Sequence, residues 1–169
     1  YQAQGATTLA DTSDLSGAAH YGTGKARFTA LRLAPVDAEG RPATVLHPGG
    51  DLLVTAQLHA TAAVPDANVA LIIYDPTGYR VLDVNTALHG RFLCLAAGQR
   101  AEVTFRLHDL RLRPQAYQLG LWLGRAGVED MDGIANVTTF IVEADPAAAA
   151  HSQEFPGVYQ CRFSEEIRT

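Results

Sequence analysis

Short runs that alternate apolar and polar residues recur along most of the chain, with turn residues between them. In the run DLLVTAQLHA at 51–60, every second residue from Leu52 to Leu58 is apolar, which places those side chains on one face of an extended strand. β-Branched and aromatic residues fill such runs, Gly and Pro separate them, and helical periodicity is nearly absent. This spacing predicts an all-β fold, an antiparallel sandwich or barrel whose apolar faces meet inside.

Eight segments have the pattern of strands: 25–33, 51–60, 68–75, 79–86, 101–109, 116–124, 136–143 and 157–163. The segment 68–75 is apolar on both faces, so we expect it near the centre of a sheet. Residues 1–21 are small and polar with no clean period, which predicts a linker that is partly disordered. The sandwich is then expected to span residues 22–165. Because the chain does not begin with Met, we expect a fragment of a longer protein.

The charge of the chain argues against a nucleic-acid-binding domain. Thirteen basic residues are scattered among 18 acidic ones, the formal net charge is -5, and Lys25 is the only lysine. The basic stripe that nucleic acid requires is therefore missing. No apolar run reaches the roughly 18 residues needed to span a bilayer. The two cysteines, Cys94 and Cys161, are too few for a disulfide framework and predict thiols in a reducing compartment.

The residues that usually carry catalysis are poorly placed for it. All four serines lie in the terminal segments, at positions 13, 16, 152 and 164, so a serine nucleophile inside the sandwich is not available. The six histidines lack the close spacing of metal ligands. The short runs GTG and PGG neither precede a helix nor continue as a phosphate-binding loop. We therefore expect no catalytic residue, no metal site and no nucleotide-binding loop in this chain.

Several other polar residues have structural interpretations. The run VEDMDG at 128–133 fails the pattern of a calcium loop, so we expect a solvated acidic loop there. Asp75 and Gly78 are expected to set a turn. Tyr117 is expected to bond to the backbone at a corner of the sandwich. A carboxylate pair suited to glycoside hydrolysis would depend on the fold, not on spacing in the sequence.

Trp122, the only tryptophan, is the most informative candidate for a binding site. By strict alternation it lies opposite the leucines at 119, 121 and 123, so it points outward if those leucines fill the core. The alternative is that strand twist, a bulge or a loop buries it. Gly120 beside it would leave a shallow hollow. An exposed indole with nearby amides suits a sugar ring, which stacks C–H groups on the aromatic face and offers hydroxyls to polar side chains.

The order of several motifs is more informative than any one of them. The chain runs from GTGKARFTALRLAPVDAEG through PGGDLLVTAQL, NVALIIYDPTGYRVLDVNT and LAAGQRAEVTFRLHDLRLRPQAYQLGLWL to VEDMDGIANVTTFIVE and FPGVYQCRF. The most specific piece has the pattern D-x-x-G-x-x-V-x-x-x-N-T, matched by Asp75, Gly78, Val81, Asn85 and Thr86. Over residues 20–165 this order resembles the C-terminal domain of Wzt-type ATP-binding subunits of O-antigen ABC transporters. PQAY at 114–117 stands where that family has a Pro-Gly turn.

The resemblance implies an immunoglobulin-like or jelly-roll β-sandwich in a cytoplasmic protein at the inner face of the bacterial inner membrane. It implies that the domain follows an ATPase domain that holds ATP and Mg²⁺, and that no cofactor belongs to this chain. The expected partners are O-antigen polysaccharide, a second copy of the chain and, through the full-length protein, a transmembrane permease subunit. In this family the last strand can be exchanged between protomers, so 157–163 is expected either to exchange or to fold back on its own chain.

Three functions remain open. The first is non-catalytic binding of O-antigen polysaccharide in a shallow groove on one sheet, which would confer substrate recognition on the exporter. Its stacking candidates are Trp122 and Tyr74, and its hydrogen-bonding candidates are Gln118, Gln57, His59, Arg106 and Thr138. Asn85 and Thr86 are expected to bond to the backbone or to contact ligand. The second function is dimerisation without sugar binding, and the third is a glycoside-acting enzyme domain with two carboxylates in one cleft.

Overall fold

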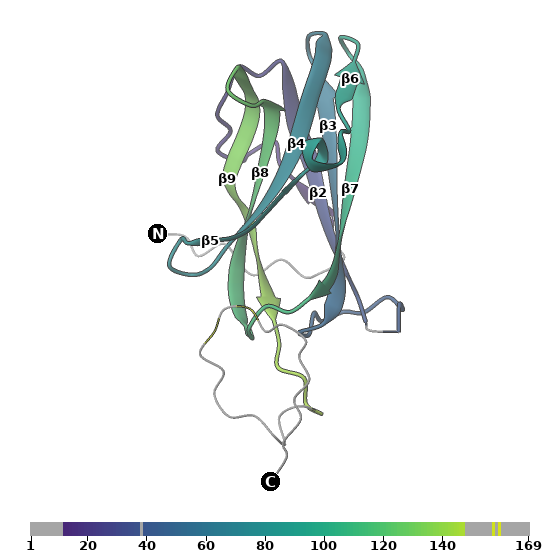
Figure 1. Ribbon diagram of the computed structural model, residues 1–169. Coiled ribbons are helices and arrows are strands. Elements are labelled where there is room, and N and C mark those ends of the chain that lie inside the picture. The colour runs from purple at the N-terminus through teal and green to yellow at the C-terminus, as the bar shows by residue number, and fades with distance from the viewer. Residues whose placement is uncertain (1–11, 38, 148–156, 158, 160–169) are drawn as a thin grey trace.

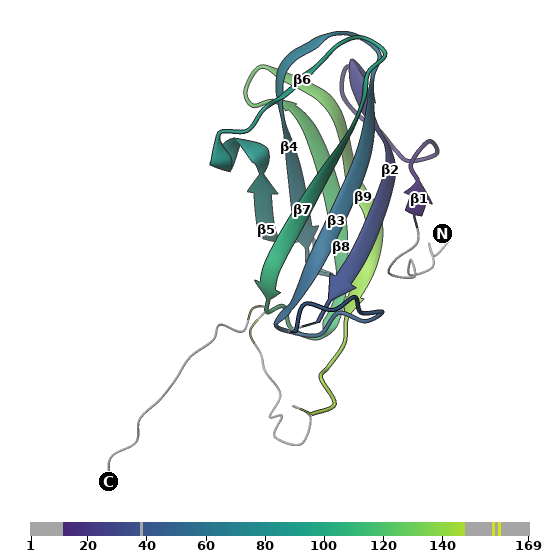
Figure 2. The same cartoon turned by 90° about the vertical axis from the view of Figure 1, so that its right-hand side faces the viewer.

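The computed structural model describes residues 12–37, 39–147, 157 and 159. Two antiparallel sheets pack face to face, as Figures 1 and 2 show from two sides. The first sheet has the strand order β1-β2-β3-β7, and the second has the order β5-β4-β8-β9, with a short β6 that also pairs with β4. This arrangement confirms the predicted antiparallel β-sandwich.

The strands of the first sheet are β1 (Thr12–Asp14), β2 (Ala26–Val36), β3 (Gly50–Ala60) and β7 (Arg100–Leu110). Those of the second are β4 (Val64–Tyr74), β5 (Arg80–Asn85), β6 (Leu93–Leu95), β8 (Gln115–Arg125) and β9 (Glu129–Val142). The 3₁₀-helix η1 (Thr86–His89) joins β5 to β6. The seven strands predicted between residues 25 and 143 all occur, and β4 lies inside its sheet as its two-sided apolar sequence indicated.

The core lies between the sheets and consists of the inward positions of the alternating strands. The β3 positions Leu52, Val54 and Ala56 are fully buried. Tyr117 of β8 stacks on Phe140 of β9, with 5.8 Å between the ring centroids. The Tyr117 hydroxyl donates a hydrogen bond of 2.9 Å to the Arg113 carbonyl, and burial raises the pKa of that hydroxyl. This is the corner contact that the sequence predicted.

The turn between β4 and β5 is organised by one carboxylate. Asp75 Oδ1 accepts hydrogen bonds from the Thr77 hydroxyl at 2.6 Å and from the backbone N–H groups of Thr77 and Tyr79. These bonds, that of the Thr77 hydroxyl first, lower the pKa of Asp75. Gly78 has a φ of 84°, which favours glycine. The predicted turn is confirmed.

The strand end that follows this turn fits its prediction in part. The hydroxyl of Thr86 accepts a hydrogen bond of 3.2 Å from the Val69 N–H, so this residue bonds to the backbone as predicted. The side-chain oxygen of Asn85 is buried and has no hydrogen-bond partner among the described residues. Only one of the two residues therefore fits the structural interpretation.

The predicted acidic loop at 128–133 is wrong, because β9 begins at Glu129. Asp132 is fully buried and lies opposite Leu123 on the core side of β8. Its Oδ2 accepts a 2.8 Å hydrogen bond from the N–H of Phe28, in the facing sheet. Its carboxylate also lies 2.8 Å from Nδ1 of His20. A buried carboxylate is tolerated where such partners replace water, and a sequence pattern does not show partners that are about a hundred residues away.

Residues 15–24, here called the N-terminal strap, cross from the first sheet to the second. Leu15 is buried in the core and its N–H donates to the Thr29 carbonyl of β2. Tyr21 exchanges two backbone hydrogen bonds of 3.0 Å with Gly133 of β9. The N–H groups of Thr23 and Gly24 donate to the carbonyls of Asp130 and Met131 on the same strand. The described part of the expected linker is therefore packed against the sandwich.

The predicted last strand, 157–163, lies outside the described residues except for Gly157 and Tyr159. Tyr159 forms a single antiparallel bridge with Leu112 of the same chain. The exchange of this strand between protomers stays a prediction.

Replacing Asp132 with Ala is expected to lower the free energy of unfolding by roughly 3 kcal/mol, because the N–H of Phe28 and the ring of His20 lose a buried partner. Urea denaturation followed by circular dichroism measures the change. The control is Asp66→Ala, which breaks the half-exposed Asp66–Arg125 ion pair of 2.9 Å and should cost less than about 1 kcal/mol. Equal losses in the two variants would contradict the structural role of Asp132.

Candidate functional site

Three aromatic rings lie on the outer face of the second sheet, and we call this surface the aromatic face. Trp122 projects outward from β8, opposite Ala70 of β4 and Gly133 of β9. Tyr74 projects outward from β4, opposite Gln118 of β8. Tyr21 reaches the same face from the strap. The outward orientation that alternation predicted for Trp122 is confirmed, and the leucines beside it fill the core.

Each ring lies over a glycine of the sheet. A Cβ atom added at Gly124 would come within 2.7 Å of the Trp122 ring, and one at Gly120 would come within 3.3 Å of the Tyr74 ring. A Cβ at Gly133 would collide with the ring of Tyr21. The missing side chains therefore let the three rings lie down on the backbone. Tyr21 is exposed there, and Trp122 and Tyr74 are partly exposed.

Polar contacts fix the orientation of the rings. Nε1 of Trp122 donates a 2.8 Å hydrogen bond to the Asp130 carboxylate. The Arg80 guanidinium lies 5.9 Å from the centroid of Tyr74 and forms a 2.8 Å ion pair with Asp83, a cation–π arrangement. Burial and the charge of Asp130 raise the pKa of Tyr21, with a further contribution from Tyr74.

Amide groups border the rings. One row across the sheet runs from Asn85 of β5 through Ala70 and Trp122 to Gly133, which carries the ring of Tyr21. The Asn85 side-chain oxygen, which has no partner among the described residues, stands at one end of this row. Gln118 stands beside Tyr74. Flat aromatic surfaces with amides around them can stack on the C–H face of a sugar and bind its hydroxyls.

The remaining candidates from the sequence lie elsewhere. Gln57, His59 and Arg106 are on the outer face of the first sheet, on the opposite side of the sandwich. Gln57 there donates to Glu102. Thr138 is buried and lies opposite Leu119 on the core side. A single groove that holds all seven candidates is therefore wrong, and only Trp122, Tyr74 and Gln118 share one surface.

The reason for this correction is geometric. Alternation tells which residues of a strand point away from the core, but it does not tell to which sheet that strand belongs. Thr138 is misplaced for a second reason. It alternates in step with Phe140 and Val142, which are buried in the core, and it pairs with the inward Leu119 of β8.

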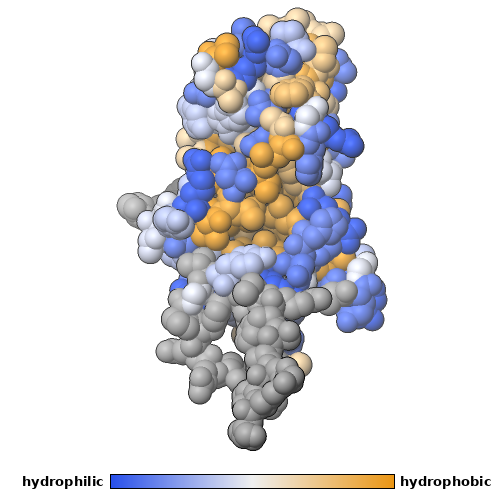
Figure 3. All heavy atoms as spheres, in the orientation of Figure 1, coloured by the Kyte–Doolittle hydropathy of each residue, from blue (hydrophilic) through white to orange (hydrophobic). Residues whose placement is uncertain are grey.

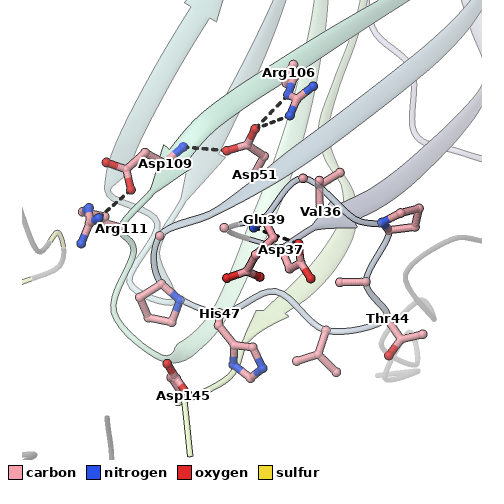
Figure 4. A pocket seen from close by; sticks show the side chains of 17 residues that line it. Val36, Asp37, Glu39, Thr44, His47, Asp51, Arg106, Asp109, Arg111 and Asp145 are labelled. Carbon is pink, nitrogen blue, oxygen red and sulfur yellow. Dashed lines mark hydrogen bonds and ion pairs between the residues drawn. The ribbon is translucent and has the colours of Figure 1, made fainter. Parts of the chain in front are cut away.

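Apart from the aromatic face, a hollow of about 900 Å³ lies at one end of the sandwich (Figure 4). Charged side chains dominate its described lining: Asp37, Glu39, His47, Asp51, Arg106, Asp109, Arg111 and Asp145. Figure 4 shows Asp51 between Arg106 and the backbone of Asp109, and Asp109 against Arg111. No Trp, Tyr or Phe is among the described lining residues. The described lining of this hollow therefore offers no aromatic stacking surface for a sugar.

Four carboxylates of this hollow, those of Asp37, Glu39, Asp51 and Asp109, form ion pairs with arginines. The backbone N–H of Asp109 and then the Arg106 side chain lower the pKa of Asp51. The backbone N–H and side chain of Arg41 lower that of Asp37. A general acid in glycoside hydrolysis requires a raised pKa, so these two groups have the opposite tuning. Among the described residues, no three His, Cys, Asp or Glu side chains gather as metal ligands.

Comparison with known proteins identifies the family. The model of the Wzt C-terminal domain family matches residues 17–161. The chain belongs to this family of non-catalytic domains of ABC transporter subunits. None of the helices in the described part of the chain has the length and apolar character to cross a membrane. The comparison with curated proteins found no match.

A solved structure of a Wzt domain agrees with the family at the level of the fold. The crystal structure of the C-terminal domain of Wzt has a TM-score of 0.69 at 15% identity, with 90% of each chain covered. A Niemann-Pick type C2 protein from Japanese carpenter ant has a TM-score of 0.48 at 8% identity and covers 76% of this chain and 98% of its own. A putative β-galactosidase from Bacteroides fragilis has a TM-score of 0.42 at 17% identity, over 62% of this chain and 16% of that one.

Replacing Asp130 with Ala is expected to release the indole of Trp122 from its hydrogen bond. The emission of the only tryptophan should then shift to the red, and acrylamide should quench it more strongly, because the ring gains mobility and contact with water. The control is Asp37→Ala, which breaks an ion pair with Arg41 at the end of the first sheet that carries no part of the aromatic face. An unchanged spectrum and quenching constant in the Asp130 variant would contradict the orientation described for Trp122.

Proposed function

We propose that this domain binds O-antigen polysaccharide, without catalysis, on the aromatic face of its second sheet. The observation that carries the proposal is that three rings lie on one outer face, each over a glycine, with Gln118 opposite Tyr74 and Asn85 opposite Ala70 in the register. Sugar rings stack on such surfaces, and hydroxyl groups meet the amides. Membership of the Wzt C-terminal domain family supports the assignment.

In the cell, binding would confer substrate recognition on an ABC exporter of lipid-linked glycan. The full-length protein would carry an ATPase domain that holds ATP and Mg²⁺, and it would meet a transmembrane permease subunit at the cytoplasmic face of the bacterial inner membrane. This context follows from the family and forms part of the proposal. A shallow aromatic surface binds each sugar weakly, so two copies that hold one polymer would raise its overall affinity.

The test is titration of the domain with the O-polysaccharide of its source strain, followed by Trp122 fluorescence and by calorimetry. Trp122→Ala is expected to weaken binding about tenfold or more, and Tyr74→Ala about three- to tenfold, since each removes a stacking surface. Gln57→Ala and His59→Ala, on the opposite sheet, serve as matched controls and should bind within about twofold of the original domain.

Two results would refute the proposal. One is that neither the cognate glycan nor an unrelated polysaccharide gives heat or a change in fluorescence. The other is that the variants of the first sheet lose affinity while Trp122→Ala and Tyr74→Ala do not. The second result would move the site to the face that carries Gln57 and His59.

A second candidate function, dimerisation, is favoured by a different surface. Figure 3 shows a band of apolar atoms between the edges of β5 and β7. Partly buried apolar side chains of these edge strands pack against the core there: Val81, Leu82, Val84, Ala101, Val103 and Phe105. We propose that a second copy of the chain covers this band, with or without exchange of the strand at 157–163. An assembly-only domain would use this surface without binding sugar.

Sedimentation measures this second proposal directly. The domain is expected to sediment as a dimer, and Val103→Glu is expected to shift it toward monomer, because a carboxylate in the covered band loses its water. Val128→Glu, at an exposed position between β8 and β9, introduces the same change outside the band and is the matched control. A folded monomer at all concentrations would reject the dimer, and unchanged glycan affinity in the monomer would separate the two functions.

A further inference from the structure

Tyr21 belongs to the aromatic face although it lies far from the other rings in the sequence. Its side chain is 49% exposed, and it occupies the space above Gly133, beside the position of Trp122 in the register. Sequence reasoning assigned this residue to a linker. The structure places it at the end of the row that begins with Asn85.

The position of the Tyr21 ring depends on the residue before it. His20 points into the molecule, where Nδ1 lies 2.8 Å from Asp132 Oδ1 and Nε2 lies 2.9 Å from the Leu15 carbonyl. The two ring nitrogens thus contact a carboxylate and a backbone carbonyl from two different segments. Consecutive residues of an extended segment point to opposite sides. The burial of His20 therefore directs Tyr21 outward onto the aromatic face.

The backbone of the strap completes this arrangement. Tyr21 accepts from and donates to Gly133, and the N–H groups of Thr23 and Gly24 donate to Asp130 and Met131 at 2.9 and 2.8 Å. The strap thus pairs with β9 beside the residue that orients Trp122. A segment held at an edge by a few hydrogen bonds opens more easily than the interior of a sheet.

We propose that Tyr21 is the third stacking residue of the glycan site, and that glycan binding and docking of the strap through His20 stabilise each other. This inference rests on the proposed function. The two events are linked because a glycan that contacts Tyr21 binds only the docked strap, and a ligand shifts an equilibrium toward the state that it prefers. Linkage is reciprocal, so undocking must lower the affinity by the same factor.

Calorimetric titration with the O-polysaccharide of the source strain tests the contact. Tyr21→Ala is expected to weaken binding about three- to tenfold, while Tyr21→Phe keeps the ring and should remain within about twofold. Gly133→Ala should weaken glycan binding by a factor similar to that of Tyr21→Ala, because the new methyl group displaces the ring of Tyr21. In the Tyr21→Ala background it should have little further effect, because the displaced ring is already absent.

The linkage is tested with His20→Ala, whose side chain does not reach the outer face. This variant should weaken binding by a factor similar to that of Tyr21→Ala, and the double variant should bind as Tyr21→Ala does. Independent effects that multiply would contradict coupling through Tyr21. Circular dichroism checks that each variant is folded. If His20→Ala does not fold, the glycan affinity of Gly133→Ala, which displaces the Tyr21 ring, is measured instead.

Hydrogen exchange gives a second readout that a purely structural role would not change. Saturating glycan should slow exchange of the amides of Tyr21, Thr23 and Gly24 more than that of Gly49, whose N–H donates to Leu110 at the opposite end of the first sheet. The difference should disappear in Tyr21→Ala. Equal slowing of all four amides would indicate only general stabilisation and would overturn the linkage.

The outcomes separate this inference from the function beneath it. If the original domain binds glycan and Trp122→Ala weakens it, the proposed function stands. Normal affinity of Tyr21→Ala then overturns the further inference and nothing else. If the original domain does not bind, the proposed function fails and the role of Tyr21 falls with it.

Discussion

The buried carboxylate of Asp132 is the contact on which the arrangement of this domain depends. It comes from β9 of the second sheet and accepts the N–H of Phe28 from β2 of the first. The register between β2 and β3 shifts directly after Phe28, and the carbonyl of Thr29 at this irregularity accepts the N–H of Leu15. His20 adds its own bond to Asp132. One carboxylate therefore connects both sheets and the strap.

A charge inside a core is stabilising only when its partners are complete. Asp132 has a backbone donor and an imidazole, and both come from segments that approach β9 from other parts of the chain. This requirement fixes where β2 and the strap lie relative to β9. The burial of Asp132 also places the aromatic face, because Gly133 is the next residue along β9 and the ring of Tyr21 lies over it.

Much of the fold was predictable, because each strand carries its own alternation. The pattern around Trp122 predicted that the leucines face inward and the indole outward. The residues at 114–117 predicted the tyrosine corner. Both inferences need only a few neighbouring residues. The assignment of Gln57 and Arg106 to the same surface as Trp122 failed, because the partition of strands between two sheets is decided by pairing over long separations.

The same limit explains what sequence reasoning missed at the candidate site. Tyr21 pairs with Gly133 and His20 with Asp132, each across more than a hundred residues. Segment 15–24 resembles a linker in composition, because its order comes from those distant partners and not from its own pattern. A glycine at 133 beside an inward carboxylate is a weak signal, and only the fold shows that a ring lies above it.

The strap also governs which side of the sandwich is open to other strands. Exposed sheet edges recruit extended chains, and short or covered edges resist this. On one lateral side, β1 has only three residues. The edge of β9 there is covered by the strap near Gly133 and by Leu46, which bridges Val142. No described residue pairs with the outer edges of β5 and β7. Addition of a further strand is thus hindered at the β1 and β9 side of the sandwich, and the described residues leave the β5 and β7 side accessible to it.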